Sequence, residues 1–579
     1  MPKLVQTTAA ALRRTVRALS KTAGVNHPLM TTANRLAYPV PGAWYHEQMA
    51  KDKNTKCSFR VKNGTLGEAC IFADGLLTRK DINDETAKET LLVFEALMQK
   101  LIDWGLDENT DLEVSGTERL GDFRIKVGFE GKVFARGEED LYSVEDRILD
   151  AYDDRVGYSY RSGYNEISIS VSRSHRTAMF ACFIASLLAV IAYIPMSMML
   201  DVNEQHYLLD GYVFPIETMY ANALLMIGAP MTFFSLLKNL TDTYVVSQKS
   251  SGIRQLQLRT LGTSAFAILL AFAAISIISV AALSNLGGTS SEYSGSLDRS
   301  FADIVTSLIP PSIFQPFEAI SPIPLIIVAL LCTYALCSAG KYFNTLRDAM
   351  MACYTLFSRM LHVLIAVLPV FCFLAIMDVL LDSGYEGALR DLLFILAIYL
   401  SLVLLFATYA IRLRVHGVKV IPFVKKLAPL LRENYSIGSA IGAAPYNIRY
   451  CSRTFKMNRE MLERDLPVLA ETNLDGNCFI IMSLALMFVF ATGTELSWIN
   501  VIALAALILF LSYGAPNQPG SILIGTLIVT MYLNSFDVVC FAIFSEAFLG
   551  SAQNLVNVIG DIVLVAIEDS KEKARTEGA

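Results

Sequence analysis

The chain has 579 residues, of which 54% are hydrophobic and 18% charged, with a formal net charge of -6. Soluble globular proteins carry about 25% charged residues, so the shortage predicts contact with lipid. The acidic balance provides no basic field for a nucleic acid partner. The ten cysteines and six histidines show no CxxC or Cys/His ligand spacing, so we expect neither a zinc site nor a disulfide scaffold.

The first 175 residues have the composition of soluble sequence. Residues 1–55 form a basic leader without the apolar core of a secretory signal, and we expect it to be flexible. Residues 56–175 alternate strand patterns near 58–61, 110–114, 123–127 and 166–171 with helical patterns at 84–104 and 144–152. This order predicts a compact cytosolic α/β sandwich domain.

From residue 176 onward, long apolar runs dominate, and many exceed the about 20 residues that a helix needs to cross a bilayer. The runs lie near 177–199, 212–238, 260–284, 321–340, 351–382, 390–412, 462–492 and 532–567. They predict an α-helical polytopic membrane protein, followed by a charged tail at 568–579.

Two shorter apolar segments, 419–450 and 497–530, are broken by small residues and proline, at Ser436–Pro445 and Ser512–Gly520. Such residues interrupt a helix. Non-helical backbone at membrane depth is tolerated only where it is buried in protein or lines a watery cavity. Paired interrupted segments of this kind indicate a transporter binding site. The alternative is an extramembrane loop between two short helices.

The run at 462–492 contains Asn473, Asp475 and Gly476, which are poor residues for a helix interior. A carboxylate such as Asp475 would be costly facing lipid. An unwound turn whose oxygens hold a cation explains all three residues.

The last apolar run places Asn554, Asn557 and Asp561 at steps of three and four, on one helix face. Glu546 lies about four turns before Asp561 on the same helix. Oxygen-rich faces suit hard cations such as sodium. A hydrogen-bond network without an ion is the alternative.

Taken in order, these segments resemble the dicarboxylate/amino acid:cation symporters, a family that includes the glutamate transporters. The resemblance runs from residue 177 to 567. It is carried by Val213–Ile216, Leu225–Ser235, Thr263–Ala267, Asn473–Asn477, Pro519–Gly520 and Asn557–Asp561, with Pro445 where a first hairpin turns back.

The family fold has eight transmembrane helices and two re-entrant helical hairpins, and works as an elevator-type transporter. The resemblance implies helices 1–6 at 176–416, comprising the scaffold and part of the transport domain, and a transport core at 417–567. It also implies a homotrimer in the cytoplasmic (inner) membrane with both chain ends in the cytosol. Arg254, Arg412 and Arg414 are compatible with that orientation.

The resemblance further implies two or three Na+ sites. The first uses the Asp561 carboxylate with backbone carbonyls of Asn473 and Asn557. The second uses the Thr263 and Ser264 hydroxyls with Asn473 and Asp475. The third uses backbone carbonyls around Ser512, Tyr513 and Ala515 and near Glu471, with Leu474 in place of the usual methionine.

The implied solute-binding residues come from both hairpins and the last two helices: Ser439, Gly442, Asn477, Gln518, Pro519, Gly520, Gly550, Gln553, Asn554 and Asn557. Three of them depart from the family. Gln553 replaces an arginine that binds a distal carboxylate, which removes a bidentate clamp. Gly550 replaces an aspartate that binds an amine, and Asn477 replaces a threonine. The loss of the arginine favours a neutral or monoanionic amino acid or another small carboxylate, whereas Gly550 argues against a standard amino-acid pocket, so the specificity stays open.

The front domain resembles the small ATPase-type domain of anti-sigma-factor kinases, at Phe94–Gln99, Gly128–Gly131 and Asp154–Asn165. It departs from that pattern at Gln99 and Phe129, which replace a metal-binding asparagine and an adenine-reading aspartate. No glycine-rich lid lies between Glu138 and Asp146. We expect a regulatory or scaffolding module with a cytosolic partner, without ATP hydrolysis.

The sequence thus favours a sodium-coupled secondary symporter of a small organic solute, embedded in the lipid bilayer. Three alternatives remain open. One is a transporter-derived solute sensor that signals through the cytosolic domain. Another is a proton-coupled dicarboxylate carrier, since Glu471 and Glu546 leave room for H+ as the coupling ion. The third is an ATP-dependent enzyme on a membrane anchor.

Overall fold

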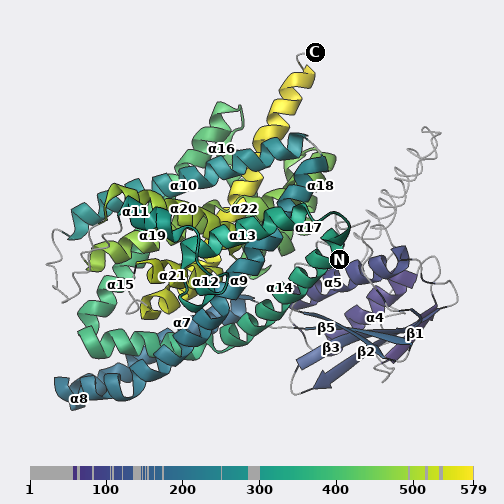
Figure 1. The fold of residues 1–579 in the computed structure, drawn as a ribbon. Helices are drawn as coiled ribbons and strands as arrows, with labels where there is room; N and C mark the ends of the chain where they lie inside the picture. Colours follow the sequence, from purple (N-terminus) through teal and green to yellow (C-terminus); the bar gives the residue numbers. More distant parts are fainter. Residues whose placement is uncertain are drawn as a thin grey trace.

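The protein consists of a sheet domain and a larger helical part (Figure 1). The computed structural model describes residues 56–60, 65–80, 82, 84–104, 106, 110–119, 122–132, 134, 145, 148–149, 152, 155–161, 163–171, 175–249, 251–283, 300–437, 439–492, 496–515, 520–533 and 539–577. The expected leader, residues 1–55, lies outside the described residues, as does most of the helix expected at 144–152.

The sheet domain has five antiparallel strands in the order β1-β2-β3-β5-β4. The strands are β1 (Lys56–Arg60), β2 (Asp111–Arg119), β3 (Asp122–Glu130), β4 (Val156–Arg161) and β5 (Tyr164–Ser170). Two helices, α4 (Thr65–Arg79) and α5 (Asp84–Asp103), contribute Leu77, Phe94 and Leu97 to one core with the strand residues Val114 and Ile125. The strand and α5 predictions are confirmed, whereas α4 was not predicted.

The strand side chains that point away from this core form a polar face of the sheet. Lys56 Nζ lies 2.5 Å from Glu113 Oε1, and the Tyr164 hydroxyl donates to Glu113 Oε2 at 3.0 Å. The hydrogen bond from Lys56 holds the pKa of Glu113 below its ordinary value. Burial, and then the bond to Glu113, raise the pKa of Tyr164 to about 12. This face is typical of a sheet with one wet side.

The first helices of the helical part cover the regions where long apolar runs were predicted. They are α7 (His175–Met199), α8 (Val202–Leu208), η2 (Leu209–Val213), α9 (Phe214–Lys249), α10 (Ser251–Leu283), α11 (Phe301–Ser307), α12 (Gln315–Glu318), α13 (Pro322–Cys337), η3 (Gly340–Tyr342), α14 (Phe343–Ala366) and α15 (Leu368–Val415). Of these, the short α8, α11 and α12 were not predicted.

Helix α15 changes direction at Gly384, whose backbone has φ 63° and ψ -158°. Glycine reaches this conformation without the steric cost that a Cβ adds. A straight helix of 48 residues would measure about 72 Å, more than twice the about 30 Å hydrocarbon core. The break at Gly384 therefore divides α15 into a shorter stretch of 16 residues, 368–383, and a longer one of 31 residues, 385–415, and only the longer stretch exceeds the about 20 residues needed to cross a membrane.

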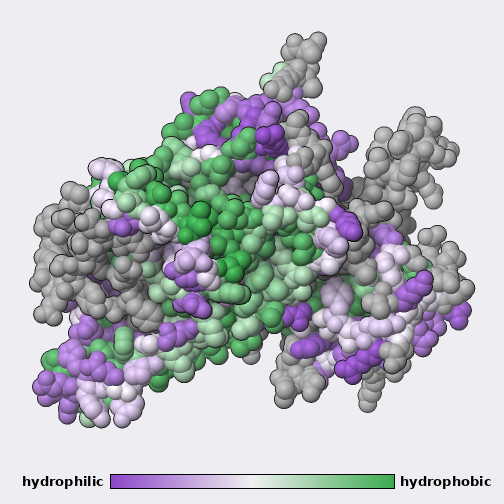
Figure 2. Space-filling model, in the orientation of Figure 1, coloured by the Kyte–Doolittle hydropathy of each residue, from purple (hydrophilic) through white to green (hydrophobic). Residues whose placement is uncertain are grey.

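On the face shown in Figure 2, apolar residues cover the middle of the helical part, with hydrophilic residues gathered toward its ends. Leu188 on α7 and Leu400 on α15 are 52% and 64% exposed. Among the described residues, seven helices are long and apolar enough to cross a membrane. Side chains that face outward while remaining this apolar are expected to contact lipid. The chain is therefore a multi-pass membrane protein.

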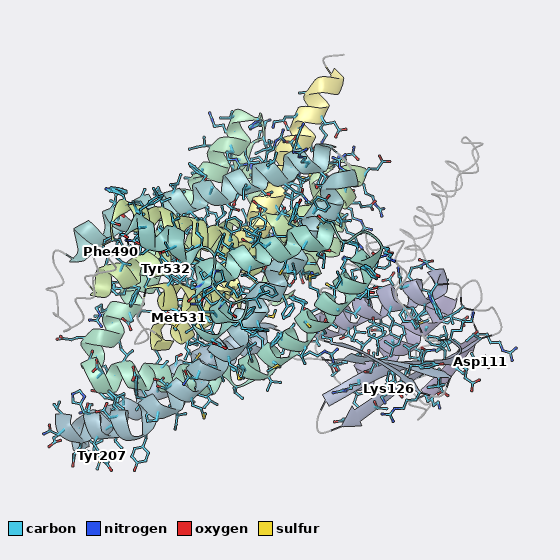
Figure 3. All side chains as sticks on the ribbon, in the orientation of Figure 1. Asp111, Lys126, Tyr207, Phe490, Met531 and Tyr532 are labelled. Carbon is cyan, nitrogen blue, oxygen red and sulfur yellow. The ribbon has the colours of Figure 1, made fainter. Side chains whose placement is uncertain are left out.

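The remaining helices form the part of the molecule that was predicted to contain broken segments. They are α16 (Val420–Ile437), α17 (Ala440–Tyr450), η4 (Cys451–Phe455), α18 (Arg459–Thr472), α19 (Asp475–Thr492), α20 (Trp498–Gly514), α21 (Ser521–Tyr532) and α22 (Val539–Glu577). Tyr532 is fully buried among them, whereas Tyr207 on α8 lies at an outer tip (Figure 3).

One detail of the first broken segment differs from the prediction. Pro445 lies inside α17 and not at the turn. The helix begins earlier because Ser439 is its N-cap, with the hydroxyl accepting the Gly442 amide at 3.2 Å. A serine in this position satisfies an amide that would otherwise lack a partner.

Candidate functional site

The centre of the site is the break between α18 and α19. Helix α18 ends at Thr472, Asn473 has φ -95° and ψ 89°, and α19 begins at Asp475. The unwound turn predicted from these residues is confirmed. Asn473, Leu474 and Asp475 are buried, with 1% exposure or less, so this polar turn lies inside the protein and not in a surface loop.

Two helices, α10 and α22, bring polar side chains to this turn. From α10, Thr263 Oγ1 donates to Asn473 Oδ1 at 3.1 Å, and Ser264 Oγ donates to Asp475 Oδ1 at 3.2 Å. Asn473 Nδ2 donates to Asp561 Oδ1 on α22 at 3.0 Å. These five side chains, Thr263, Ser264, Asn473, Asp475 and Asp561, are called the cation cluster below. The structure thus brings together the side chains expected at two of the sodium sites.

Tyr409 on α15 also belongs beside the cation cluster, although it was not predicted. Its hydroxyl donates to Asp475 Oδ2 at 2.8 Å, and its side chain is 3% exposed. A tyrosine within an apolar run usually contributes only the packing of its ring. The sequence pattern does not distinguish such a tyrosine from one whose hydroxyl makes a hydrogen bond. The signal available was weak: a polar atom deep in a membrane segment needs a partner.

A second group of amides lies one turn away. Gln553 Nε2 and Asn557 Nδ2 both donate to Asn477 Oδ1, the latter at 3.0 Å, and Asn557 Oδ1 accepts the Gly476 amide at 2.8 Å. Ser521 Oγ on α21 donates to Gln553 Oε1 at 2.8 Å. Asn477, Ser521, Gln553 and Asn557 are called the amide cluster below. Ser521 was not predicted.

The N-terminus of α21 is closed by a carboxylate. The Gly520 and Leu523 amides donate to the two oxygens of Glu546, each at 2.9 Å. Helix N-termini favour negative charge. Gly550, one turn after Glu546, is packed against it, since a Cβ at Gly550 would lie 2.6 Å from Glu546 Oε1. The expected solute residues Gly520 and Gly550 therefore both adjoin Glu546.

Other predicted residues make hydrogen bonds outside these clusters. Ser439 and Gly442 bond to each other in the α17 cap. Asn554 Nδ2 donates to the Asn434 carbonyl of α16 at 3.4 Å. Gln518 and Pro519 lie outside the described residues.

The expected third sodium site lies at the end of α20. Ser512, Tyr513 and Ala515 are all buried there. The Ser512 carbonyl accepts the Ala515 amide at 3.2 Å, and the Tyr513 carbonyl accepts Asn239 Nδ2 at 2.6 Å. Asn239 on α9 was not predicted. Two of these carbonyls thus already accept one hydrogen bond each, while Glu471 lies in the last turn of α18.

The cation cluster offers oxygen atoms, as a hard cation requires. Two carboxylates, Asp475 and Asp561, two hydroxyls and one amide meet in a buried space. Gly560 provides room for them, because a Cβ there would lie 2.7 Å from Asn473 Nδ2 and 3.5 Å from Asp475 Oδ2. Within the described residues, no group of three or more His, Cys, Asp or Glu side chains could hold a metal ion, and the cation cluster combines its two carboxylates with neutral oxygen atoms. The donor set fits sodium.

In the sheet domain, two of the residues compared with an ATPase motif make contacts within the domain. Phe129 is 1% exposed, within the core, and its ring centroid lies 6.4 Å from that of Trp104. The Gln99 amide donates to Asp103 Oδ1 at 2.8 Å. The position of the adenine-reading aspartate is therefore filled by core packing.

Comparison with known proteins supports the resemblance of the helical part. The family model described as the sodium:dicarboxylate symporter family matches residues 177–570, more than half of the chain. A search of curated proteins finds no match. The matched region begins at α7 and includes both clusters and all the helices that carry them. The chain belongs to the sodium:dicarboxylate symporter family, whose members are transporters and not enzymes.

Proposed function

We propose that this chain is a sodium-coupled symporter that carries a neutral or monoanionic amino acid, or another small carboxylate, across the cytoplasmic membrane. The observation that supports it most is the buried cation cluster, in which Asp475 and Asp561 share Asn473 as a neighbour. Membership of the family already implies sodium coupling and a small solute. The solute class and the residues that hold each ion are our inference.

Sodium would be held at two positions in the cation cluster, one at Asp561 and one at Asp475 with Thr263 and Ser264. An unpaired carboxylate at bilayer depth is costly, and a bound cation removes that cost. A third position at the end of α20 would use backbone carbonyls. Each ion that enters at 100 mV supplies about 2.3 kcal/mol, and a tenfold gradient adds about 1.4 kcal/mol.

The amide cluster supports a solute other than a simple dicarboxylate. Gln553 bonds to Ser521 and Asn477, which are neutral. A dicarboxylate would need a cationic partner for its distal group, and a neutral amide gives about half the hydrogen-bond strength of a charged one. A solute with one carboxylate, or with balanced charges, suits this position better.

The architecture that we propose has eight membrane helices and two re-entrant hairpins, α16–α17 and α20–α21, within a homotrimer whose chain ends lie in the cytosol. The stretch of α15 after Gly384 would count as a crossing by itself. The transport part would move against a scaffold as an elevator. The Asn239–Tyr513 hydrogen bond joins α9 to α20, and it would have to break in that movement.

Uptake into proteoliposomes tests this proposal. Purified full-length protein is reconstituted, a sodium gradient is imposed, and labelled amino acids, monocarboxylates and dicarboxylates are compared. We expect accumulation of one of the first two classes that collapses when sodium is equal on both sides. Accumulation driven by a proton gradient alone would favour a proton-coupled carrier instead.

Asp561→Asn is expected to reduce uptake to background, because it removes the charge while keeping the shape. Asp569→Asn is the matched control two turns further along α22, where Asp569 Oδ1 accepts the Asn458 amide at 2.9 Å. The control is expected to keep sodium-driven uptake. Solute binding with no accumulation under any gradient would contradict transport and support a sensor that signals through the sheet domain.

A further inference from the structure

We propose that Tyr409 is a positioning residue for sodium binding, which holds one oxygen of Asp475 so that the other is presented to the cation. The inference rests on the proposed function, since it assumes that Asp475 binds sodium. It adds a residue of α15 to a site otherwise built from α10, the α18–α19 break and α22. Tyr409 itself acts only through Asp475.

The two oxygens of Asp475 have different partners. Oδ2 accepts the Tyr409 hydroxyl at 2.8 Å, and Oδ1 accepts the Ser264 hydroxyl at 3.2 Å. The shorter bond is with the tyrosine, and both side chains are buried. Carboxylate χ2 is a broad torsion with little intrinsic preference. A fixed hydrogen bond on one oxygen therefore decides which way the other oxygen faces.

The neighbouring backbone is shaped around this contact. A Cβ at Gly560 would lie 3.1 Å from the Tyr409 hydroxyl and 2.7 Å from Asn473 Nδ2. Any larger residue would push the phenol or the amide away. Glycine costs stability in a helix interior, so its presence here allows Tyr409, Asn473 and Asp475 to approach one another.

A second influence from α15 acts through space. The charge of Arg412, three residues after Tyr409, also acts on Asp475. The electrostatic effect of Arg412 does not fix the orientation of the Asp475 carboxylate as a hydrogen bond does. This effect remains when the Tyr409 hydroxyl is removed. Replacing Tyr409 by phenylalanine therefore separates the loss of positioning from a change in local charge.

Sodium titration of the purified full-length protein tests the proposal. Thermal unfolding is followed as sodium replaces choline at constant ionic strength, and the sodium dependence of the midpoint gives the affinity. We expect Tyr409→Phe to weaken sodium affinity about tenfold, the scale of one hydrogen bond to a charged group. A merely structural role would lower the midpoint equally with and without sodium.

Three further variants control the result. Tyr193→Phe removes the hydroxyl of another buried tyrosine, which donates to Gln205 at 3.1 Å, and should keep the wild-type sodium affinity. Gly560→Ala should weaken the affinity by displacing the Tyr409 hydroxyl together with the Asn473 amide, and wild-type affinity in this variant counts against the positioning role if Tyr409→Phe does not fold. Asp561→Asn reports whether sodium binding by the cluster is measured at all.

Wild-type affinity in Tyr409→Phe, together with loss of binding in Asp561→Asn, would overturn the positioning role and leave the proposed function intact. If Tyr409→Phe does not fold, wild-type affinity in Gly560→Ala overturns it. If the wild-type protein gains no stability from sodium, both the positioning role and the proposed function are wrong.

Discussion

Replacing Gly476 by alanine should separate α19 from α22 and disable the amide cluster. A Cβ built on Gly476 would lie 2.4 Å from the Gln553 carbonyl oxygen and 2.8 Å from Asn557 Oδ1. Contacts between carbon and a carbonyl oxygen are normally about 3.3 Å or longer. Helix α22 must therefore retreat by about 0.9 Å, because the closest atom belongs to its backbone and no side-chain rotation can relieve the contact.

The retreat has two costs. Overpacking of a well-packed core costs about 1–3 kcal/mol, and loss of the Gly476–Asn557 hydrogen bond costs about 1 kcal/mol more. We therefore expect Gly476→Ala to lower the free energy of unfolding by about 2–4 kcal/mol. Solute binding should fall further, since Asn557 and Gln553 lie on the displaced helix face.

The assay is thermal unfolding of the purified protein, with and without the transported solute. Gly228→Ala on α9 is the matched control, because the nearest atom to its added Cβ, Ile524 Cγ2, is 3.7 Å away, an ordinary contact distance. If Gly476→Ala unfolds at the same temperature as Gly228→Ala and keeps its solute-dependent stabilisation, the close approach of α19 and α22 is wrong.

Three other predictions concern the rest of the chain. The pKa of Tyr164 is raised from 10.0 to about 12, so the neutral phenol stabilises the folded state. This contribution to the free energy of unfolding is lost as the pH rises from 10 to about 12. In Tyr164→Phe, the free energy of unfolding should not fall in that pH range for this reason, which alkaline unfolding measures. Phe129→Asp should destabilise the sheet domain by about 3–5 kcal/mol, measured by limited proteolysis, and a gain of fluorescent nucleotide binding would contradict this reasoning. Gly384→Ala should cost about 1–3 kcal/mol, since its backbone conformation is essentially restricted to glycine; an unchanged unfolding temperature would refute it.

Most side chains of the cation cluster could be predicted from the sequence, whereas their hydrogen-bond partners on neighbouring helices could not. Asn473, Asp475 and Asp561 are polar residues inside long apolar runs, so burial requires them to find polar partners. The same reasoning predicted the break between α18 and α19, because polar residues at the end of an apolar helix favour a turn. A polar residue is easiest to interpret where its surroundings are most apolar.

The partners that were missed share a different property. Tyr409, Asn239 and Ser521 each contribute one hydrogen bond to a residue that is distant in the sequence. Tyrosine and serine are common in membrane helices for packing reasons alone. Nothing in their local pattern distinguishes a residue whose polar atom points to the site from one that points elsewhere. Only the packing of α9, α15 and α21 against the site makes that distinction.

Two of the departures from the family, Gly550 and Gln553, lie near Glu546 on α22. Its carboxylate occupies the α21 amides and lies against Gly550, so a side chain at position 550 would collide with it. The position of the Glu546 carboxylate thus requires a residue without a side chain at position 550. Gln553, at the next turn, bonds to Ser521 beside the same helix start. Helix α22 thus holds α21 through one carboxylate and one neutral amide, and on the proposed function a solute that binds here would have to exchange with these internal bonds. Such an exchange between hydrogen-bond partners yields about 0.5–1.5 kcal/mol per bond, so each contact that the solute gains here would add only a small net free energy of binding.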